Sequence, residues 1–296
     1  MITIVVPVYN EEKSISRFVK ELVDLKIDYE VIFVCDPSSD ETIPKLKELS
    51  NVDPKKYKTI LMSRRFGQHA CIIAGLNHSL GDAVVVMDID GQDPVSLLPN
   101  MIEKWQEGYE VVYARRTKRE GLNIINKLSA KIGLYLISKL SYIDIPRNVG
   151  EYRLMDKRVV NELLRFNEQS PFLRGMVSYV GFTQTSVEFT RPDRSDGVAK
   201  YNKFFGSISF GITGLISFSS KPLVLSFLFF ISFFILFVIN IFTNIFSNLN
   251  GVTSLILLIG SLQFLSLSII GMYIANINNQ VLNRPSYIID QFIGDF

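Results

Sequence analysis

The feature that most constrains this chain is a long stretch without a charged residue. No Asp, Glu, Lys or Arg occurs between Lys221 and Arg284. About 20 apolar residues suffice to cross the hydrocarbon core of a bilayer. The stretch contains two such segments, 222–242 and 252–275, separated by the Asn-rich turn TNIFSNLNG. Because a core helix of a soluble protein would still show one polar face, we predict two transmembrane helices within 222–276.

Basic residues flank this pair of segments and are absent from the turn between them. Lys200, Lys203 and Lys221 precede the first segment, and Arg284 follows the second. Lys and Arg concentrate in cytoplasmic loops, so we expect both termini and the soluble part in the cytoplasm, at the inner (plasma) membrane. The Gly- and Ser-rich segment 203–221 is expected to be an amphipathic helix in the membrane interface, because a third span would place one terminus outside.

Residues 1–202 are expected to form one cytoplasmic domain, and 277–296 a cytoplasmic tail. Five short apolar runs have the length and composition of buried strands, namely 3–9, 29–35, 58–63, 83–88 and 110–115. Helix-like segments lie between them, and this alternation predicts an α/β fold with a mainly parallel sheet. In such sheets ligands bind beyond the carboxyl ends of the strands.

Composition and missing motifs exclude several classes of protein. The 31 Lys and Arg residues balance 29 Asp and Glu to a net charge of +2, so we expect no nucleic-acid partner. Neither GxGxxG nor GxxxxGK[ST] occurs, and Cys35 and Cys71 are expected to be buried reduced thiols. We expect no cleaved signal peptide, since MITIVVPVYN has no basic n-region. His69 and His78 lack metal-site spacing and are interpreted as structural or surface residues.

Polar or charged residues follow four of the predicted strands, at 10–12, 36–40, 64–68 and 88–93. Four such strand ends at one predicted edge of a sheet indicate a binding site. In MDIDGQDP, Asp88 and Asp90 have the spacing and oxygen ligands that suit Mg²⁺ or Mn²⁺, whose coordination phosphate oxygens would complete. Such an ion would neutralise a diphosphate leaving group. Taken alone, Asp-x-Asp is also an ordinary loop or capping pattern.

With these motifs in order, the chain resembles the family 2 glycosyltransferases of GT-A fold, and among them the polyprenyl-phosphate type: bactoprenol glucosyltransferases and dolichyl-phosphate mannose synthases. The matching pieces run through nearly the whole chain: VVPVYNEE (5–12), FVCDPSSDET (33–42), SRRFGQHACIIAGLNHSLGDAVVVMDIDGQDP (63–94), KWQEGYEVVYARRTKREG (104–121), GEYRLMDKRVV (150–160), FLRGMVSYVGF (172–182), RPDRSDGVAKY (191–201), SFSSKPL (217–223) and NRPSYII (283–289).

The resemblance implies roles at the matching positions. Nucleotide-sugar binding is implied for Pro7, Tyr9, Asn10, Glu11, Asp36, Arg65, Gln68, Asp88 and Asp90. The metal would be held by Asp88 and Asp90, with Asp90 the more direct ligand. The implied catalytic set is Asp90, Asp93 and Glu151, where Glu151 takes the place of the acidic residue of GDFRLMD that is often discussed as a general base. Contacts to the diphosphate or the acceptor phosphate are implied for Arg153, Arg191, Arg194, Lys200 and Tyr201.

The sequence also departs from the family's usual pattern. Cys35, Pro37 and Arg65 differ from the common residues of the donor loops, which leaves the donor's identity open. Gly91 replaces a frequent Leu, and Ala199 a Ser. Glu151 replaces an Asp and moves the carboxylate by one methylene, which bears on acceptor geometry.

The resemblance implies an inverting transfer of one sugar from a nucleotide-diphosphate sugar to polyprenyl phosphate at the cytoplasmic membrane face. Glucose on uridine diphosphate is the first expectation, and GlcNAc, galactose and mannose remain open. One alternative is transfer to the hydroxyl of a lipid-linked glycan, with Glu151 as a true base. Another is a non-catalytic membrane partner with the same fold. A homo-oligomer could form through the spans, and O-antigen or other cell-surface polysaccharide modification is the expected setting.

Overall fold

A computed structural model describes residues 1–117, 146, 148–166, 168, 171–190, 231–232, 235 and 249–296. These residues fall into two compact units. Unit 1 takes in those within Met1–Lys127, Ile145–Lys203 and Pro285–Phe296, and unit 2 takes in those within Leu128–Asp144 and Phe204–Arg284.

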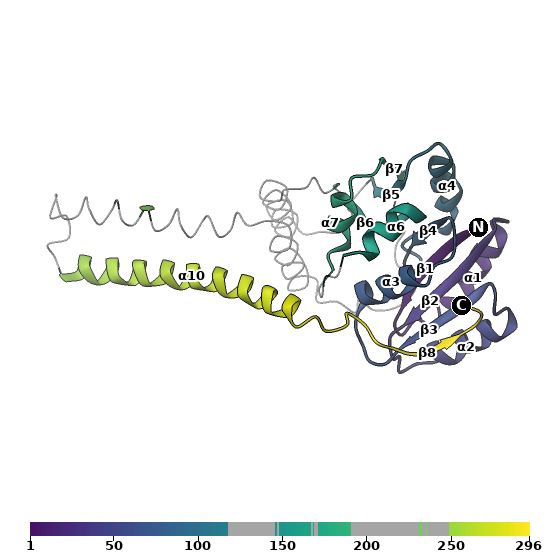
Figure 1. The fold of residues 1–296 in the computed structure, drawn as a ribbon, viewed down its shortest axis with the longest axis horizontal. Coiled ribbons are helices and arrows are strands. Elements are labelled where there is room, and N and C mark those ends of the chain that lie inside the picture. Colours follow the sequence, from purple (N-terminus) through teal and green to yellow (C-terminus); the bar gives the residue numbers. More distant parts are fainter. Residues whose placement is uncertain are drawn as a thin grey trace. The chain divides into compact units, whose positions relative to one another are not determined.

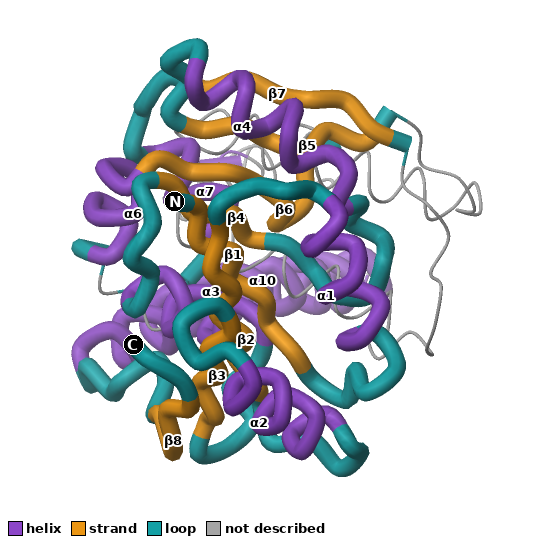
Figure 2. The backbone as a smooth tube through the Cα atoms, turned by 90° about the vertical axis from the view of Figure 1, so that its right-hand side faces the viewer, coloured by secondary structure: helices purple, strands orange, loops and turns teal. Residues whose placement is uncertain are grey.

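Unit 1 is built on an eight-stranded sheet with the strand order β7-β5-β6-β4-β1-β2-β3-β8, which runs from top to bottom in Figure 2. The strands are β1 (Ile2–Val8), β2 (Tyr29–Cys35), β3 (Tyr57–Met62), β4 (Ala83–Val86), β5 (Val111–Arg116), β6 (Val149–Asp156), β7 (Gln184–Phe189) and β8 (Ile289–Ile293). All five predicted strands are confirmed as β1 to β5.

Most neighbouring strands of the sheet are parallel. Pairing is parallel for β1 with β2, β1 with β4, β2 with β3 and β5 with β7. Pairing is antiparallel where β6 and β8 join the sheet.

Helices cover both faces of this sheet (Figures 1 and 2). On one face lie α1 (Ile15–Asp24), α2 (Thr42–Val52) and α4 (Leu98–Gln106), the last entered through the 3₁₀ turn η1 (Val95–Leu97). On the other face lie α3 (Gln68–Asn77), α6 (Lys157–Leu164) and α7 (Leu173–Tyr179). Successive side chains of a strand point to opposite faces. Accordingly Ile4 and Val6 join the core beneath α1, whereas Val5 faces α3.

Close packing of α3 on the sheet depends on a glycine. A Cβ atom at Gly75 would lie only 2.3 Å from Cγ1 of Val5 and 3.1 Å from Cγ2 of Val34. Any larger side chain would therefore push α3 away from β1 and β2. This contact matters for function, because α3 starts at the edge of the sheet where the polar loops gather.

The last residues of the chain return to the sheet as an edge strand. β8 pairs with β3, and the Ser63 amide donates to the Ile288 carbonyl at 3.0 Å. Asn77 Nδ2 donates to Tyr287 Oη at 3.0 Å, and the rings of Phe292 and Phe296 pack against His78. The segment 277–296, expected to be a tail, thus contributes a strand beside the loop that follows β3.

Unit 2 contributes one long described helix, α10 (Leu249–Val281), of 33 residues. At 1.5 Å per residue it is about 50 Å long. It contains the predicted second span, and some of its apolar side chains are exposed, Phe264 at 73% and Ile256 at 63%. Within the part of the chain that the structure describes, no helix combines the length and apolarity that a bilayer crossing requires. The first predicted span and the segment 203–221 lie almost wholly outside the described residues.

Candidate active site

The loops after β1 and β2 are joined by hydrogen bonds in both directions. The Asn10 amide donates to Ser38 Oγ at 3.0 Å, and the Ser39 amide donates back to Asn10 Oδ1 at 2.9 Å. Asn10 has a left-handed backbone with φ 52°, which Asn tolerates better than most residues. The Glu11 amide donates to Thr42 Oγ1 at 2.8 Å. The two loops therefore form one rigid wall of the site.

Pro7 lies in β1, between two other strands, yet it removes no ladder hydrogen bond that β4 needs. The pairing of β1 with β4 ends at Val5 and Val86, and the Met87 amide donates to the Val5 carbonyl at 3.2 Å. Beyond that point the two strands part, so the missing N–H of Pro7 costs nothing in the sheet. The chain after β4 leaves here to form the acidic loop.

Asp36, at the end of β2, holds the loop that follows β3. Asp36 is 3% exposed, and its carboxylate accepts from the amides of Phe66 (3.0 Å) and Gly67 (2.9 Å). Gly67 has φ 92°, a conformation that favours glycine. These charge-assisted bonds fix the loop that carries Arg65. The Arg65 guanidinium in turn stacks on the Tyr9 ring at 4.1 Å, a cation–π contact between the first and third loops.

The acidic loop after β4 folds back on itself. The Asp88 amide donates to Asp93 Oδ2 at 3.1 Å, and the Gln92 amide donates to Asp90 Oδ1 at 3.0 Å. Asp90 and Asp93 are 5% and 4% exposed, whereas Asp88 is half-buried and accepts from Gln68 Nε2 at 2.7 Å. Three carboxylates are thus gathered beside the start of α3.

This donor set fits a divalent ion that shares its coordination with a substrate. Among the described residues, no group of three or more His, Cys, Asp or Glu side chains is arranged to hold a metal. Asp88 and Asp90 supply hard carboxylate oxygens two residues apart. Mg²⁺-type ions are commonly bound by one or two carboxylates plus substrate phosphates and water. Asp88 and Asp90 could therefore hold such an ion together with a diphosphate.

A second charged cluster lies at the start of β6, which runs antiparallel to β4. Val86, the last residue of β4, is the register partner of Arg153, so Glu151 lies in the part of β6 that extends beyond the carboxyl end of β4. Glu151 Oε2 accepts from Arg153 Nη2 at 2.9 Å, and Oε1 accepts from Arg174 Nε at 2.9 Å. His69 Nε2 lies 3.8 Å from the same Oε1.

The Glu151 carboxyl is 8% exposed and is strongly polarised by its neighbours. Burial alone would raise its pKa, but the Arg153 guanidinium, together with His69 and Arg174, lowers the pKa well below its ordinary value. Glu151 is therefore a carboxylate throughout the neutral range. It acts on its surroundings as a fixed negative charge between cations.

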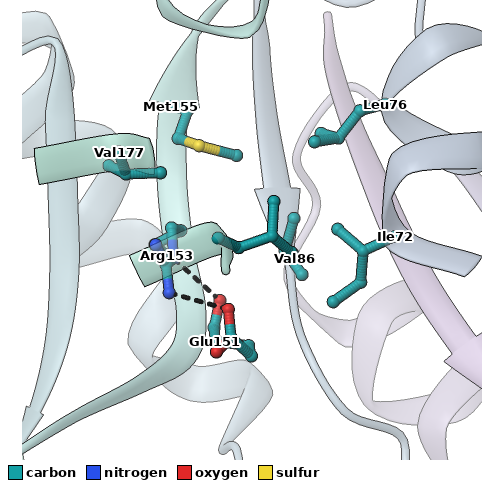
Figure 3. A pocket seen from close by; sticks show the side chains of 8 residues that line it. Ile72, Leu76, Val86, Glu151, Arg153, Met155 and Val177 are labelled. Carbon is teal, nitrogen blue, oxygen red and sulfur yellow. Dashed lines mark hydrogen bonds and ion pairs between the residues drawn. The ribbon is translucent and has the colours of Figure 1, made fainter. Parts of the chain in front are cut away.

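Arg153, predicted to contact a phosphate, is buried in the structure. Its side chain is 2% exposed and donates to the carbonyls of Gly150 and Glu151 as well as to the Glu151 carboxylate. It lies between the sheet and helices α3 and α7, where apolar side chains of Ile72, Val86 and Val177 line the same small pocket (Figure 3). A guanidinium buried there serves as the counter-ion of Glu151.

A comparison with known protein families identifies the family of this domain. The profile described as "Glycosyl transferase family 2" matches residues 3–164, from β1 to the end of α6. The chain belongs to glycosyl transferase family 2. It is a glycosyltransferase with a GT-A-like α/β domain, which sets aside the non-catalytic alternative.

Two similar proteins and one solved structure place this family 2 glycosyltransferase more closely. It is 42% identical to the "Uncharacterized glycosyltransferase YkcC" of Bacillus subtilis (strain 168), over 99% of this chain and 94% of the relative. It is 36% identical to the "SfII prophage-derived bactoprenol glucosyl transferase" of Shigella flexneri, over 97% of each chain. Its fold resembles glucosyl-3-phosphoglycerate synthase from Mycobacterium tuberculosis, solved with Mn²⁺, UDP-glucose and glycerol 3-phosphate (TM-score 0.51, 18% identity, 73% of this chain and 79% of that one).

The structure brings together most of the residues expected in the glycosyltransferase site. The loop contacts above join Tyr9, Asn10, Asp36, Arg65, Gln68 and the three aspartates of the acidic loop at one edge of the sheet. Glu11 lies in the same wall and also accepts from Ser14 Oγ at 2.9 Å. Four predicted phosphate-binding residues lie outside the described residues: Arg191, Arg194, Lys200 and Tyr201.

Two site residues escaped the sequence analysis. His69 was interpreted as structural or surface, yet it follows Gln68 and faces Glu151. Arg174 lies in the quoted motif FLRGMVSYVGF, but that motif alone gave no reason to bring it near residue 151. One signal was present in the sequence: the charged residues Glu151 and Arg153 lie in the middle of a strand that is mostly apolar. Buried charges of this kind require partners, and Arg174 is one of them.

Proposed function

We propose that this glycosyltransferase moves a sugar, glucose in the first instance, from a nucleotide-diphosphate sugar to polyprenyl phosphate. The observation that carries the proposal is that an acidic loop and the charged cluster around Glu151 lie at the same edge of the sheet. The acidic loop of residues 88–93 suits a metal-bound diphosphate, and the Arg-rich cluster around Glu151 suits a second phosphate. The relative named as a bactoprenol glucosyl transferase, aligned over 97% of both chains, supports the same acceptor and sugar.

The donor side supplies binding and charge neutralisation. A divalent ion, Mg²⁺ or Mn²⁺, would be held by Asp88 and Asp90 and would stabilise the negative charge that develops on the leaving diphosphate. Gln68 fixes the orientation of the Asp88 carboxylate through its 2.7 Å hydrogen bond. The wall formed by the loops after β1 and β2 receives the nucleoside, and Asp36 keeps the Arg65 loop beside it.

The reaction is an in-line displacement at the anomeric carbon. An oxygen of the acceptor phosphate forms the new bond to that carbon, while the bond from the carbon to the diphosphate oxygen breaks. The electron pair leaves with the nucleoside diphosphate, and the configuration inverts. Since a phosphate monoester has its second pKa near 6, the acceptor is already largely ionised at neutral pH and requires no strong base.

The state of Glu151 favours this phosphate acceptor over a hydroxyl acceptor. A general base for a hydroxyl works best with a pKa near the operating pH. Here the neighbouring cations lower the pKa of Glu151 instead. Such a carboxylate orients Arg153, Arg174 and His69 and is poorly suited to abstracting a proton. Transfer to the hydroxyl of a lipid-linked glycan is therefore the less favoured candidate.

A lipid acceptor also accounts for the uncharged C-terminal third, and membrane attachment is part of the proposal. We place the two spans within 222–276, an interfacial helix at 203–221 and both termini in the cytoplasm. The pairing of β8 with β3 supports termini on one side, because β1 and β8 belong to the same sheet. The exposed apolar residues of α10, such as Phe264 at 73%, support contact with lipid or with further copies of the chain.

A transfer assay on membranes that contain the full chain tests the proposal. The reaction would contain undecaprenyl phosphate, Mg²⁺ or Mn²⁺, and one radiolabelled UDP- or GDP-sugar at a time, followed by lipid extraction. We expect label in an acid-labile, alkali-stable lipid with UDP-glucose. Label transferred from a different nucleotide sugar would identify that compound as the donor instead of UDP-glucose. Absence of labelled lipid with every donor, for a protein shown to be folded, would contradict the proposed reaction.

A further inference from the structure

The loop that carries Arg65 is held by three separate parts of the chain. The loop after β2 binds two of its backbone amides, and a tyrosine ring of the loop after β1 stacks on the Arg65 guanidinium. The third contact comes from residues 287–296, which we call the β8 segment and which lie beside β3 (Figure 2). Here the Ser63 amide, at the start of the loop, donates to the Ile288 carbonyl at 3.0 Å.

The β8 segment also contacts the far end of α3, the helix into which this loop leads. Asn77 Nδ2 donates to Tyr287 Oη at 3.0 Å. The ring centroids of Phe292 and Phe296 lie 4.9 Å and 5.9 Å from that of His78. Because β3, the loop and α3 follow one another in the chain, the β8 segment contacts this unit both before and after the loop.

The β8 segment lies close against neighbouring backbone at its other end as well. The ladder between β3 and β8 is irregular between Leu61 and Met62, just before the loop. The Asp295 amide donates to the Pro54 carbonyl at 2.8 Å. Gly294 has φ 104°, and a Cβ atom there would lie only 3.0 Å from the same carbonyl oxygen. A larger residue at this position would therefore displace the segment.

We propose that the β8 segment positions the Arg65 loop and α3 for binding of the sugar donor. This inference rests on the proposed function, in which the loop and the hydrogen-bonded pair of Gln68 and Asp88 belong to the donor side. Displacement of the segment would release the loop at Ser63, two residues before Arg65. Residues 282–286 alone lie between α10 and the segment, so a support of the donor loop closely follows the proposed second span in the sequence.

The competing explanation is that the β8 segment only covers the edge of the sheet. An uncovered edge strand can pair with other chains, and a covering role concerns stability and association alone. A positioning role makes an additional prediction, because the coupling between two binding equilibria is reciprocal. If the segment stabilises the donor-binding form of the loop, then bound donor must stabilise the segment.

Hydrogen–deuterium exchange of the full-length wild-type protein in detergent tests this reciprocity without a mutation. Exchange would be followed with Mn²⁺ alone and with Mn²⁺ plus UDP-glucose at about 100 times its dissociation constant, an excess that slows a binding-incompatible opening by up to about 100-fold. We expect the amides of β8 to exchange about 10- to 100-fold more slowly with the donor. The amides of β7, at the opposite edge of the sheet, should change much less.

Steady-state kinetics of two glycine variants test the effect on donor binding. Gly294→Val and its matched control, Gly108→Val, both place a side chain on a left-handed backbone, with φ 104° and 100°. A Cβ atom at Gly108, however, would meet no neighbouring group within 4 Å. We expect Gly294→Val to raise the KM for the donor about 10-fold or more, because fewer molecules keep the loop in its binding position. The KM for undecaprenyl phosphate should stay near the wild-type value in both variants, as should the donor KM of Gly108→Val.

Protection of the Arg65 loop by the donor without protection of β8 would overturn the inference, and so would equal protection of β7 and β8. An unchanged donor KM in folded Gly294→Val, or an equal rise in both KM values, would also contradict it. If Gly294→Val does not fold, the exchange experiment on the wild type decides alone. Failure of the proposed function looks different, because the donor would then leave the exchange of the Arg65 loop itself unchanged, or the wild-type protein would form no labelled lipid.

Discussion

The loops after β1, β2 and β3 and the cluster around Glu151 lie at the same edge of one sheet, yet different interactions stabilise them. In the loops after β1, β2 and β3, side chains bind backbone amides of the next loop, as Asp36 does with Phe66 and Gly67. At the start of β6, a buried carboxylate binds two guanidinium groups. Contacts between side chains and backbone amides therefore shape the loops after β1, β2 and β3, and paired charges shape the cluster around Glu151.

This difference predicts how the loops and the cluster around Glu151 each respond to mutation. Loss of an amide–carboxylate contact in a loop displaces that loop and leaves the sheet intact. Loss of one member of a buried charge cluster leaves the others uncompensated in a medium of low dielectric constant, which is strongly destabilising. The cluster around Glu151 should thus be the part of the candidate site where function and stability are most tightly coupled.

The largest effect is expected for Glu151→Gln. Breaking a buried ion pair typically costs about 3–5 kcal/mol, because Arg153 is left without its counter-ion. We expect a fall of that order in the free energy of unfolding, together with a large but incomplete loss of sugar transfer. Denaturant or thermal unfolding measures it, with Glu162→Gln as the exposed control. Equal free energies of unfolding for the two variants would show that the cluster around Glu151 does not stabilise the fold.

The next largest effect is expected for Asp90→Asn, on the acidic loop. Asn keeps an oxygen for the Gln92 amide but loses the charge that would bind the metal. We expect transfer to fall about 100- to 1,000-fold, the scale at which lost electrostatic stabilisation is usually felt. The free energy of unfolding should hold or rise, since one of three like charges is removed. Metal titration of activity checks this, and the exposed Asp24→Asn provides the control.

A full loss of stability in Asp90→Asn would contradict the contrast between the two sides. So would retention of metal-dependent transfer at the wild-type rate, which would also remove Asp90 from the metal site. The two readouts are independent, so the stability result and the activity result can each be judged separately.

How much of this could be read from the sequence depends on how local each signal is. β1 to β5 are predictable because each is a short apolar run, and the loops at 10–12, 36–40 and 88–93 follow them directly. β6 interrupts its apolar pattern with Glu151 and Arg153, and β8 is a short segment distant in sequence from its partner β3. The meeting of His69, Glu151 and Arg174 requires three elements to be packed together, which no local pattern encodes.

A smaller effect is expected for Asp36→Asn. One side-chain oxygen would remain for the amide of Phe66 or Gly67, and the other amide would face an NH₂ group. We expect the KM for the donor to rise about 10- to 50-fold because the Arg65 loop shifts. A change of this size is typical for the loss of charge-assisted hydrogen bonds. The KM for the acceptor should not change. Kinetics with each substrate varied in turn test this, and equal rises in both would indicate a general disturbance.

The smallest expected effect concerns pH. Because the pKa of Glu151 is lowered in the folded state, the group contributes stability above its unfolded pKa, near 4.3, and that contribution disappears as the pH falls through the lowered value. Between about pH 5 and 8 its ionisation is constant. The residual activity of Glu151→Gln should therefore vary with pH as the wild type does. An acidic limb present in the wild type and absent in the variant would make Glu151 a base.

The most direct test of the account compares two acceptors that differ in one group. The wild-type protein would be given the same labelled nucleotide sugar with either polyprenyl phosphate or the corresponding polyprenol. We predict that label enters only the phosphate-bearing lipid, because the proposed acceptor is an anion that is already a nucleophile and Glu151 is poorly suited to act as a base. Equal labelling of the alcohol, with an acidic limb that depends on Glu151, would show that the acceptor is a hydroxyl and that the central claim is wrong.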